Sequence, residues 1–242
     1  MAIKKFKVIL VDTEVIAPNV KHMTFRSINS YDFSFKPGQF ITFIFNQENK
    51  ILRRSYSIAT IPSTSKNIEI AISYVSKGFS SDILFNLEVG QELNVMGPLG
   101  KLILPKDTAD IRNIVLMGTN TGITPYRSMI NSLKEIENYG HIYILLGVKY
   151  RSDIIYSKDF LLLEEKNKRI KFISCLSREK FVRINEFKGY VQGYLRLLDL
   201  DSCKDIVYLC GNPNMVDDTR KYLHEINFSS EKVIREKYIS SN

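Results

Sequence analysis

The pattern of hydrophobic and polar positions changes near residue 105. Before that point, short runs of strand-forming residues lie between turn signals such as Lys36-Pro37-Gly38. The clearest of these runs are residues 7–11, 39–45, 68–74 and 92–96. Short strands at even spacing with little helix predict a small antiparallel β-barrel over residues 1–105, with one helix at about residues 80–87.

Past residue 105, apolar runs alternate with helix-like stretches. The apolar runs are residues 113–117, 141–146, 169–175 and 205–210. Between the first two, apolar residues recur at helical spacing from Tyr126 to Ile136, which predicts one helix. Repetition of strand, helix and strand predicts an α/β domain over residues 106–242, with a parallel sheet covered by helices. Such a sheet binds ligands beyond the carboxyl ends of its strands, so functional residues are expected in the loops there.

Composition and charge narrow the class of protein. The chain has 34 Lys and Arg against 26 Asp and Glu, a formal net charge of +8, without any block of five like charges. This argues against a nucleic-acid-binding tail. A diffuse basic surface can steer an acidic protein partner or an anionic cofactor toward a cleft, and the alternative is that the lysines only keep the surface soluble. No apolar run approaches a membrane span, and residues 8–11 are too short for a signal-peptide core. We expect a monomeric cytoplasmic protein that is not bound to membranes.

Cysteine and histidine positions predict no metal site. The three cysteines are scattered and lack the CxxC spacing of iron–sulfur or zinc ligands, and the three histidines are isolated.

The segment Arg54-Ser55-Tyr56-Ser57 places a cation, an aromatic ring and a hydroxyl within four residues. On an extended strand alternate side chains share a face, so Arg54 and Tyr56 point one way and the serines the other. A guanidinium pairs with phosphate oxygens and a tyrosine ring offers stacking area, which suits a flavin nucleotide. The alternative is a plain barrel strand with a surface arginine.

A pyrophosphate site is indicated where the chain leaves a strand after Tyr74. Gly78 allows close approach, and the backbone amides of Phe79, Ser80 and Ser81 lie at the start of the expected helix. The alternative is ordinary helix capping by a serine.

A glycine-rich loop at residues 118–125 follows the first parallel strand. Gly122 would let the backbone pass close to a nucleotide, Thr121 and Thr124 supply hydroxyls, and Pro125 suits a first helical turn. The loop is not a GxGxxG fingerprint, and a glycine-rich turn alone is weak evidence.

Cationic and polar side chains follow the second and third parallel strands. Arginines beside a serine suit a ribose 2′-phosphate, and a tyrosine can stack on adenine. The candidates are Lys149, Ser177, Arg178, Arg183, Lys188, Tyr190 and Gln192. An ordinary exposed basic stretch would look the same.

The last parallel strand ends at Cys210, and Gly211 and Met215 follow it. A small polarizable thiol can pack beside a nicotinamide ring, although a free buried cysteine is by default a small hydrophobic residue. The chain closes with a final strand at residues 233–239, which carries Glu236 and Tyr238.

Taken in order, these segments resemble the ferredoxin/flavodoxin–NADP⁺ reductase family, particularly its bacterial members, over nearly the whole chain. Residues 54–57 look like the RxYS flavin motif, 78–81 like the GxxS pyrophosphate loop, 118–125 like the TGxxP loop and 209–216 like the LCGNPxMV segment. The resemblance implies an FAD-binding barrel followed by an NADP-binding α/β domain.

On the flavin side, the resemblance implies that Tyr56 stacks on the isoalloxazine, Arg54 binds the FAD pyrophosphate and Ser57 lies beside flavin N5. Cys210 and Glu236 look like the thiol and carboxylate that the family places near the hydride-transfer site. On the nucleotide side, the resemblance implies that Arg178 and Ser177 bind the 2′-phosphate of NADP(H).

The implied activity is electron transfer between NADP(H) and ferredoxin or flavodoxin through FAD. A hydride passes to flavin N5, and single electrons then leave to an acidic protein partner. The alternatives are a reductase component of an oxygenase, a flavin or ferric reductase, or a non-catalytic flavin-binding docking module.

The chain departs from the bacterial pattern at two places. Residues 188–192 look more like the plastid-type KxYxQ adenine segment, and Tyr238 is followed by Ile239 and a polar tail where bacterial enzymes often end at an aromatic pair.

Overall fold

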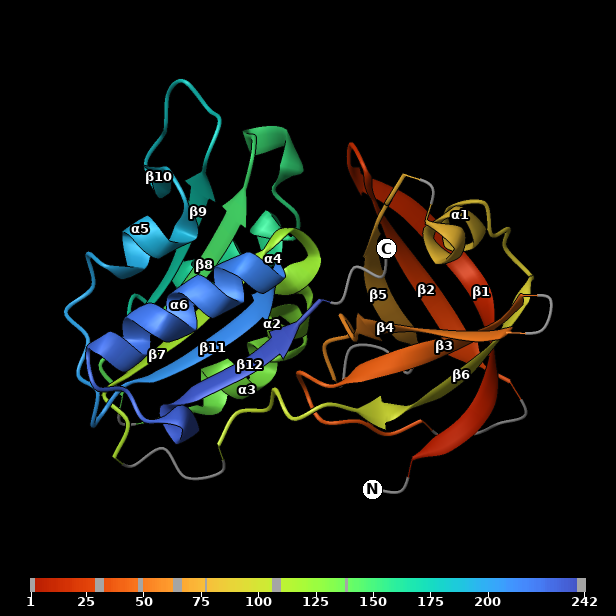
Figure 1. The fold of residues 1–242 in the computed structure, drawn as a ribbon, viewed down its shortest axis with the longest axis horizontal. Coiled ribbons are helices and arrows are strands. Elements are labelled where there is room, and N and C mark those ends of the chain that lie inside the picture. Colours follow the sequence, from red (N-terminus) through yellow and green to blue (C-terminus); the bar gives the residue numbers. More distant parts are fainter. Residues whose placement is uncertain are drawn as a thin grey trace.

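A computed structural model describes residues 3–28, 33–47, 50–62, 67–76, 78–105, 110–137 and 139–238. It contains a barrel and an α/β domain that lie side by side (Figure 1). This is the two-domain architecture predicted from the hydrophobic pattern. The expected boundary between residues 105 and 106 lies at the edge of the described ranges. No helix in these ranges is long and apolar enough to cross a membrane.

The barrel is a six-stranded antiparallel sheet in the order β4-β3-β6-β1-β2-β5. Ile58 follows β4 directly and bridges to Ile70 of β5, so the two ends of the sheet meet. Buried apolar side chains such as Phe25 and Phe43 fill the interior. The elements are β1 (Lys4–Ala17), β2 (Val20–Ser27), β3 (Phe40–Gln47), β4 (Lys50–Ser57), β5 (Ile68–Ser73), α1 (Phe79–Phe85) and β6 (Glu92–Leu99).

The second sheet is parallel throughout, in the order β10-β9-β8-β7-β11-β12. The chain builds outward from β7 in one direction and returns to add β11 on its other side. This change of direction between β7 and β11 is the topological switch point, where such sheets bind ligands. The strands are β7 (Asn113–Thr119), β8 (His141–Val148), β9 (Ile170–Leu176), β10 (Glu186–Lys188), β11 (Ile206–Gly211) and β12 (Val233–Lys237).

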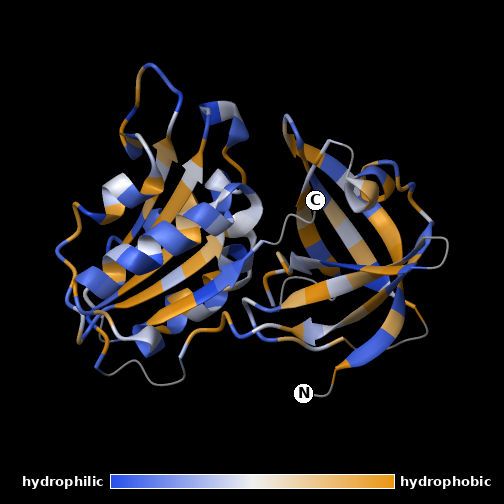
Figure 2. Cartoon of the chain, viewed as in Figure 1, coloured by the Kyte–Doolittle hydropathy of each residue, from blue (hydrophilic) through white to orange (hydrophobic). Residues whose placement is uncertain are grey.

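Helices cover both faces of this sheet, and hydrophobic residues concentrate on its strands (Figure 2). The single helix predicted over residues 126–136 is divided at Met129 into two short helices. The helices are α2 (Thr124–Ser128), α3 (Ile130–Glu135), α4 (Ser157–Lys166), α5 (Val191–Leu195) and α6 (Pro213–Glu225). The core beneath α2, α3 and α4 continues into the barrel through Ala17, Val20 and Ala71.

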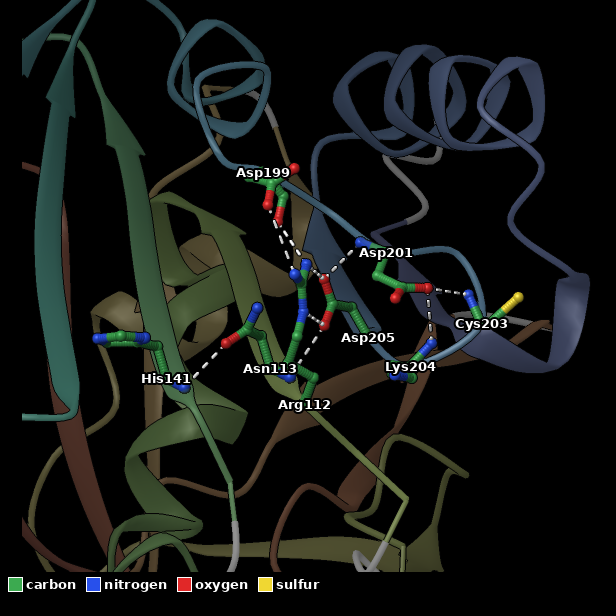
Figure 3. A network of polar contacts seen from close by, with 8 residues as sticks. All are labelled: Arg112, Asn113, His141, Asp199, Asp201, Cys203, Lys204 and Asp205. Atoms are coloured by element: carbon green, nitrogen blue, oxygen red, sulfur yellow. Dashed lines mark hydrogen bonds and ion pairs between the residues drawn. The ribbon is translucent and has the colours of Figure 1, made fainter.

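A polar network joins the amino ends of β7 and β11 (Figure 3). The fully buried Asp205 carboxylate accepts hydrogen bonds from Arg112 Nε at 3.0 Å and from the second guanidinium nitrogen at 2.7 Å. The backbone N–H groups of Asn113 and Asp201 donate to the same carboxylate, at 3.0 and 2.7 Å. The network is therefore internally satisfied, at the end of the sheet opposite to the switch point.

Candidate active site

The three predicted catalytic residues meet where the two domains face each other. Ser57 ends β4 of the barrel, whereas Cys210 lies near the carboxyl end of β11 and pairs with Glu236 of β12. The Ser57 and Tyr238 side chains lie beside the Cys210 thiol, where both act to lower its pKa. The fold thus brings together four predicted side chains from opposite halves of the chain.

Cys210 is fully buried, and its thiol is protonated at neutral pH. Burial is the largest cause that raises the pKa of Cys210, and the charge of Glu236 raises it further, against the hydrogen bonds of Tyr238 and Ser57. Only the thiolate is a strong nucleophile. Cys210 is therefore suited to packing against a ligand ring and not to covalent chemistry.

Glu236 is a carboxyl group with an unused oxygen. Its Oε2 is buried without a hydrogen-bond partner in the described part of the chain. Burial raises the pKa of Glu236 to about 7, so the group exchanges its proton near neutral pH. A group with such a pKa is suited to hold or release a proton beside a reacting atom.

Tyr238 ties the end of β12 to the glycine-rich loop. Its hydroxyl donates to the Thr121 carbonyl oxygen at 2.7 Å, and its backbone N–H donates to the Gly211 carbonyl oxygen at 2.9 Å. In this structure Tyr238 therefore holds the end of β12 against the glycine-rich loop and the end of β11. A direct contact with a cofactor ring stays a prediction.

Two glycines let the loop after β7 pack on the end of β11. A Cβ atom at Gly122 would lie 2.2 Å from the Cys210 carbonyl oxygen, and one at Gly118 would lie 2.7 Å from the Gly122 carbonyl oxygen. These contacts explain the glycines by backbone packing around Cys210, without requiring a ligand. Thr119 also belongs here, because its Oγ1 accepts the Asn212 N–H at 2.9 Å, and the sequence analysis did not single it out.

The flavin motif lies on β4 with the alternation expected of a strand. Arg54 and Tyr56 are half-buried, whereas Ser55 is exposed. The Tyr56 ring packs edge-on against Phe43, with centroids 5.7 Å apart, and burial raises the pKa of Tyr56 to about 12. Ser55 forms a hydrogen bond with Thr42, Oγ to Oγ1, at 2.9 Å. Tyr56 is thus held rigidly, which suits a stacking surface.

The two serines of the predicted pyrophosphate loop differ. Gly78 is the N-cap of α1 and no side chain caps the helix, so a serine N-cap is not present. Ser81 Oγ lies 2.8 Å from the Val75 carbonyl oxygen and 2.9 Å from that of Gly78, and closes the turn. Ser80 Oγ is buried and has no partner in the described ranges. Tyr74 is exposed, and its hydroxyl forms a hydrogen bond with Asp82, which raises the pKa of Tyr74.

The predicted 2′-phosphate residues lie at neighbouring strand ends. The Ser177 and Arg178 N–H groups donate to the Val148 and Lys149 carbonyl oxygens at 3.0 and 2.9 Å, which binds the loops after β8 and β9 together. Arg178, Lys149 and Arg183 are exposed, so their charges face solvent.

The predicted adenine residues line a cavity of about 520 Å³ between α5 and α6. Lys188, Tyr190 and Gln192 form one wall, and α6 contributes Thr219 and Tyr222, which sequence reasoning missed. Tyr190 is 74% exposed, so its ring is open to stacking. Thr219 is buried, and its Oγ1 has no partner in the part of the chain that the structure describes.

Two family models together match most of the chain. An oxidoreductase FAD-binding domain matches residues 7–103, and an oxidoreductase NAD-binding domain matches residues 116–221. Ferredoxin–NADP reductase B of Sorangium cellulosum is 28% identical over 222 residues, which cover 89% of this chain and 90% of the relative.

The chain belongs to the ferredoxin/flavodoxin–NADP⁺ reductase family. The resemblance inferred from its motifs is thereby confirmed. As a member of this family it is a flavoprotein oxidoreductase with an FAD-binding domain and an NAD(P)-binding domain.

The chain is also similar to reductase components of an oxygenase. The reductase component of propane 2-monooxygenase from Mycolicibacterium smegmatis is also 28% identical, over 92% of this chain but only 64% of the relative. The fold is shared with a ferredoxin NADP⁺ reductase from Neisseria gonorrhoeae (TM-score 0.84, 18% identity, 98% of this chain and 99% of that one). It is also shared with the Amycolatopsis cytochrome P450 reductase GcoB (TM-score 0.86, 20% identity, 98% and 70%).

Unpartnered polar atoms of this reductase fit the two cofactors. Ser80 Oγ lies at the predicted pyrophosphate loop, and Thr124 Oγ1 and Glu236 Oε2 lie near the predicted nicotinamide end. Buried polar atoms are nearly always hydrogen-bonded, so an unpartnered atom at such a place indicates a bound ligand. Thr13 of β1 has the same feature without belonging to a predicted site.

Proposed function

We propose that this reductase transfers electrons between NADP(H) and a ferredoxin or flavodoxin through FAD. The observation that carries the proposal is the meeting of Ser57 from the barrel with Cys210 and Glu236 from the α/β domain. A flavin held by the barrel and a nicotinamide held at the switch point would share this place.

We expect the chain's own residues to bind the two cofactors, orient them and exclude water from the site. The Tyr56 ring offers a rigid stacking face, and Arg54 offers a guanidinium to phosphate oxygens. The buried Cys210 side chain excludes water, and Glu236 holds a proton within the site. When bound, FAD and NADP(H) supply the hydride and electron transfer, while the protein supplies alignment.

The charges around β9 favour NADP(H) over NAD(H). Arg178, Arg183 and Lys188 are exposed on the segment that follows β9, where we expect the ribose to lie. A 2′-phosphate adds negative charge that these cations can neutralise, and NADH has no such group.

We expect Arg178→Ala to weaken NADPH binding by about 10- to 100-fold, as loss of one charge-assisted contact does, with little change for NADH. Titration of the oxidised protein with each nucleotide measures both affinities. Lys204→Ala removes an exposed cation from the opposite edge of the sheet and serves as the control. Unchanged NADPH affinity in Arg178→Ala would refute this 2′-phosphate site.

A groove on the barrel supports an acidic protein partner. A cavity of about 630 Å³ is lined by Lys4 and Lys5, and by Lys7, which forms an ion pair of 3.0 Å with Glu92, over apolar side chains that include Ile28 and Ile44. Lysines around an apolar floor complement a partner with carboxylates around an apolar contact. We therefore expect electron transfer to the partner to slow as salt is raised.

Anaerobic reduction of the purified flavoprotein tests the function. Rapid bleaching by NADPH with FAD bound, followed by reoxidation on addition of an oxidised ferredoxin or flavodoxin, would support the proposal. A flavin that neither nucleotide bleaches would instead support the docking module, and absence of flavin after reconstitution would refute the assignment.

The second candidate is the reductase component of an oxygenase. It is favoured by the propane 2-monooxygenase reductase component from Mycolicibacterium smegmatis, which matches at the same 28% identity as the ferredoxin–NADP reductase. Faster bleaching of the flavin by NADH than by NADPH would support the oxygenase reductase component over the ferredoxin or flavodoxin reductase.

A further inference from the structure

Arg127 of α2 joins the two domains through its guanidinium. Its Nε donates to Asp159 Oδ2 of α4 at 2.6 Å, within the α/β domain. Another nitrogen of the same group donates to Glu69 Oε2 of β5 at 2.7 Å and to the Ala59 carbonyl oxygen at 2.8 Å, both in the barrel. The side chain is 17% exposed, so these bonds form in a largely dry interface. An ion pair with two carboxylates in such a place is geometrically strict.

Further contacts surround this guanidinium. The Tyr156 ring lies 4.8 Å from its central carbon, and the Tyr156 hydroxyl forms a hydrogen bond of 2.8 Å with His22 Nδ1 of β2. Two more bonds cross the interface nearby, from Gly38 N–H to Ser128 Oγ at 2.8 Å and from the Asn131 side chain to the Pro62 carbonyl oxygen at 3.0 Å.

Arg127 is tied to the two short segments that carry the reacting groups. Ala59, which accepts its hydrogen bond, is two residues beyond Ser57. In the other direction, α2 directly follows the loop in which Gly122 packs on the Cys210 carbonyl oxygen. The guanidinium therefore connects the segment that follows the flavin strand to the helix that follows the loop beside Cys210.

We propose that Arg127 is a positioning residue that sets the distance between the flavin site and the nicotinamide site. The inference rests on the proposed hydride transfer between these sites. Reacting atoms must approach to about 3–3.5 Å, and a misplacement of about 1 Å can cost roughly 100-fold in rate. A planar guanidinium with fixed donors holds such an alignment better than a flexible ammonium does.

The first test measures the rate of flavin bleaching in a stopped-flow instrument at saturating NADPH. We expect Arg127→Gln to slow this rate about 10- to 100-fold, with NADPH affinity and FAD content unchanged, and Arg127→Lys to fall between it and the wild type. Loss of the cation leaves Glu69 partly buried with only His22 beside it, at 3.7 Å. The double variant Arg127→Gln/Glu69→Gln removes that charge and should remain folded but slow.

The matched control is Arg112→Gln. Arg112 also binds a buried carboxylate, but both partners lie in the α/β domain at the far edge of the sheet. We expect it to lower the melting temperature and leave the bleaching rate unchanged. Wild-type bleaching rates in Arg127→Gln and in the double variant would overturn the proposal, whereas a wild-type protein that no nicotinamide bleaches would overturn the proposed function.

A second measurement tests the positioning role of Arg127 in protein that is not turning over substrate. Spin labels at Glu88→Cys in the barrel and Lys221→Cys on α6, in a Cys203→Ser background, report the distance between the domains. Glu88, Lys221 and Cys203 are all exposed. We expect Arg127→Gln to broaden or shift the distance distribution and Arg112→Gln to leave it unchanged. An identical distribution in Arg127→Gln would refute the positioning role.

Discussion

The two ends of the parallel sheet differ in how their buried polar groups are hydrogen-bonded. We call the end at which the strands begin the amino edge and the end at which they finish the carboxyl edge. At the amino edge, the Asp205 carboxylate receives hydrogen bonds from Arg112 and from two backbone N–H groups. At the carboxyl edge, Glu236 Oε2 and Thr124 Oγ1 are buried without partners in the described ranges. A satisfied network stabilises the fold, whereas an unsatisfied one is retained where a ligand supplies the missing bonds. The comparison therefore separates residues that hold this protein together from residues that we propose bind a cofactor.

The largest effect should come from the amino edge. We expect Asp205→Ala to lower the free energy of unfolding by about 3–5 kcal/mol, because it leaves the Arg112 guanidinium and two N–H groups without their acceptor. Urea unfolding followed by circular dichroism measures the loss. Molecules that remain folded should keep the wild-type bleaching rate.

Asp199→Ala is the matched control for that change. Asp199 contacts the same guanidinium at 3.5 Å, but its side chain is fully exposed. We expect its stability to lie within about 0.5 kcal/mol of the wild type. Equal losses in the two variants would contradict the view that the amino edge depends on a buried, satisfied carboxylate.

At the carboxyl edge, Glu236 should make stability depend on pH. Because its pKa is about 7 in the folded protein against an ordinary 4.5, the folded state retains a proton that the unfolded state has lost between these values. Stability from this group therefore falls as pH rises through that window and levels off above it. Glu236→Gln removes the dependence, and should be more stable than the wild type at pH 8 by on the order of 2–3 kcal/mol, but not at pH 4.

Unfolding curves at pH 4, 6 and 8 for both proteins measure this difference, and the bleaching rate of Glu236→Gln should also lose its pH dependence near neutrality. A constant stability difference across this range would show that Glu236 does not titrate there.

The smallest effects come from a pair of neighbouring serines that extend the comparison to the barrel. Ser81→Ala should cost about 1–2 kcal/mol of stability, because Ser81 Oγ closes the turn onto Val75 and Gly78. Ser80→Ala should leave the stability of the apoprotein nearly unchanged and weaken FAD binding by about 10-fold, since its unpartnered hydroxyl has no bond to lose within the protein. Unfolding of the apoprotein and FAD titration check the pair, and the reverse pattern would contradict both assignments.

Much of the fold follows from local pattern, because side chains facing a core recur with the period of their element. The runs at residues 113–117 and 141–146 become β7 and β8, and the turn after residue 74 leads into α1. The helix expected over residues 126–136 divides at Met129. The sequence did not predict this break, because a regular apolar spacing does not reveal a local change of direction.

The candidate site is predictable only in part. Arg54, Tyr56 and Cys210 stand in recognisable segments, because flavin and nucleotide binding require particular residue types at fixed spacing. Short sequence motifs cannot predict the Arg127 contacts, because Glu69 is 58 residues away in sequence and lies in another domain. Likewise, the packing of Gly122 on the Cys210 carbonyl oxygen joins residues whose spacing follows no motif.

The sequence by itself determined the two-domain architecture, the FAD- and NAD-binding domains and the family, because each depends on residue types and short spacings. Only the tertiary structure decided which buried polar atoms remain unpartnered, such as Glu236 Oε2, and which glycines serve backbone packing. It also decided that Arg127 joins the barrel to the α/β domain across the interface. These properties depend on distances between segments far apart in the chain, and such distances are set by the packing of the whole protein and not by any local pattern.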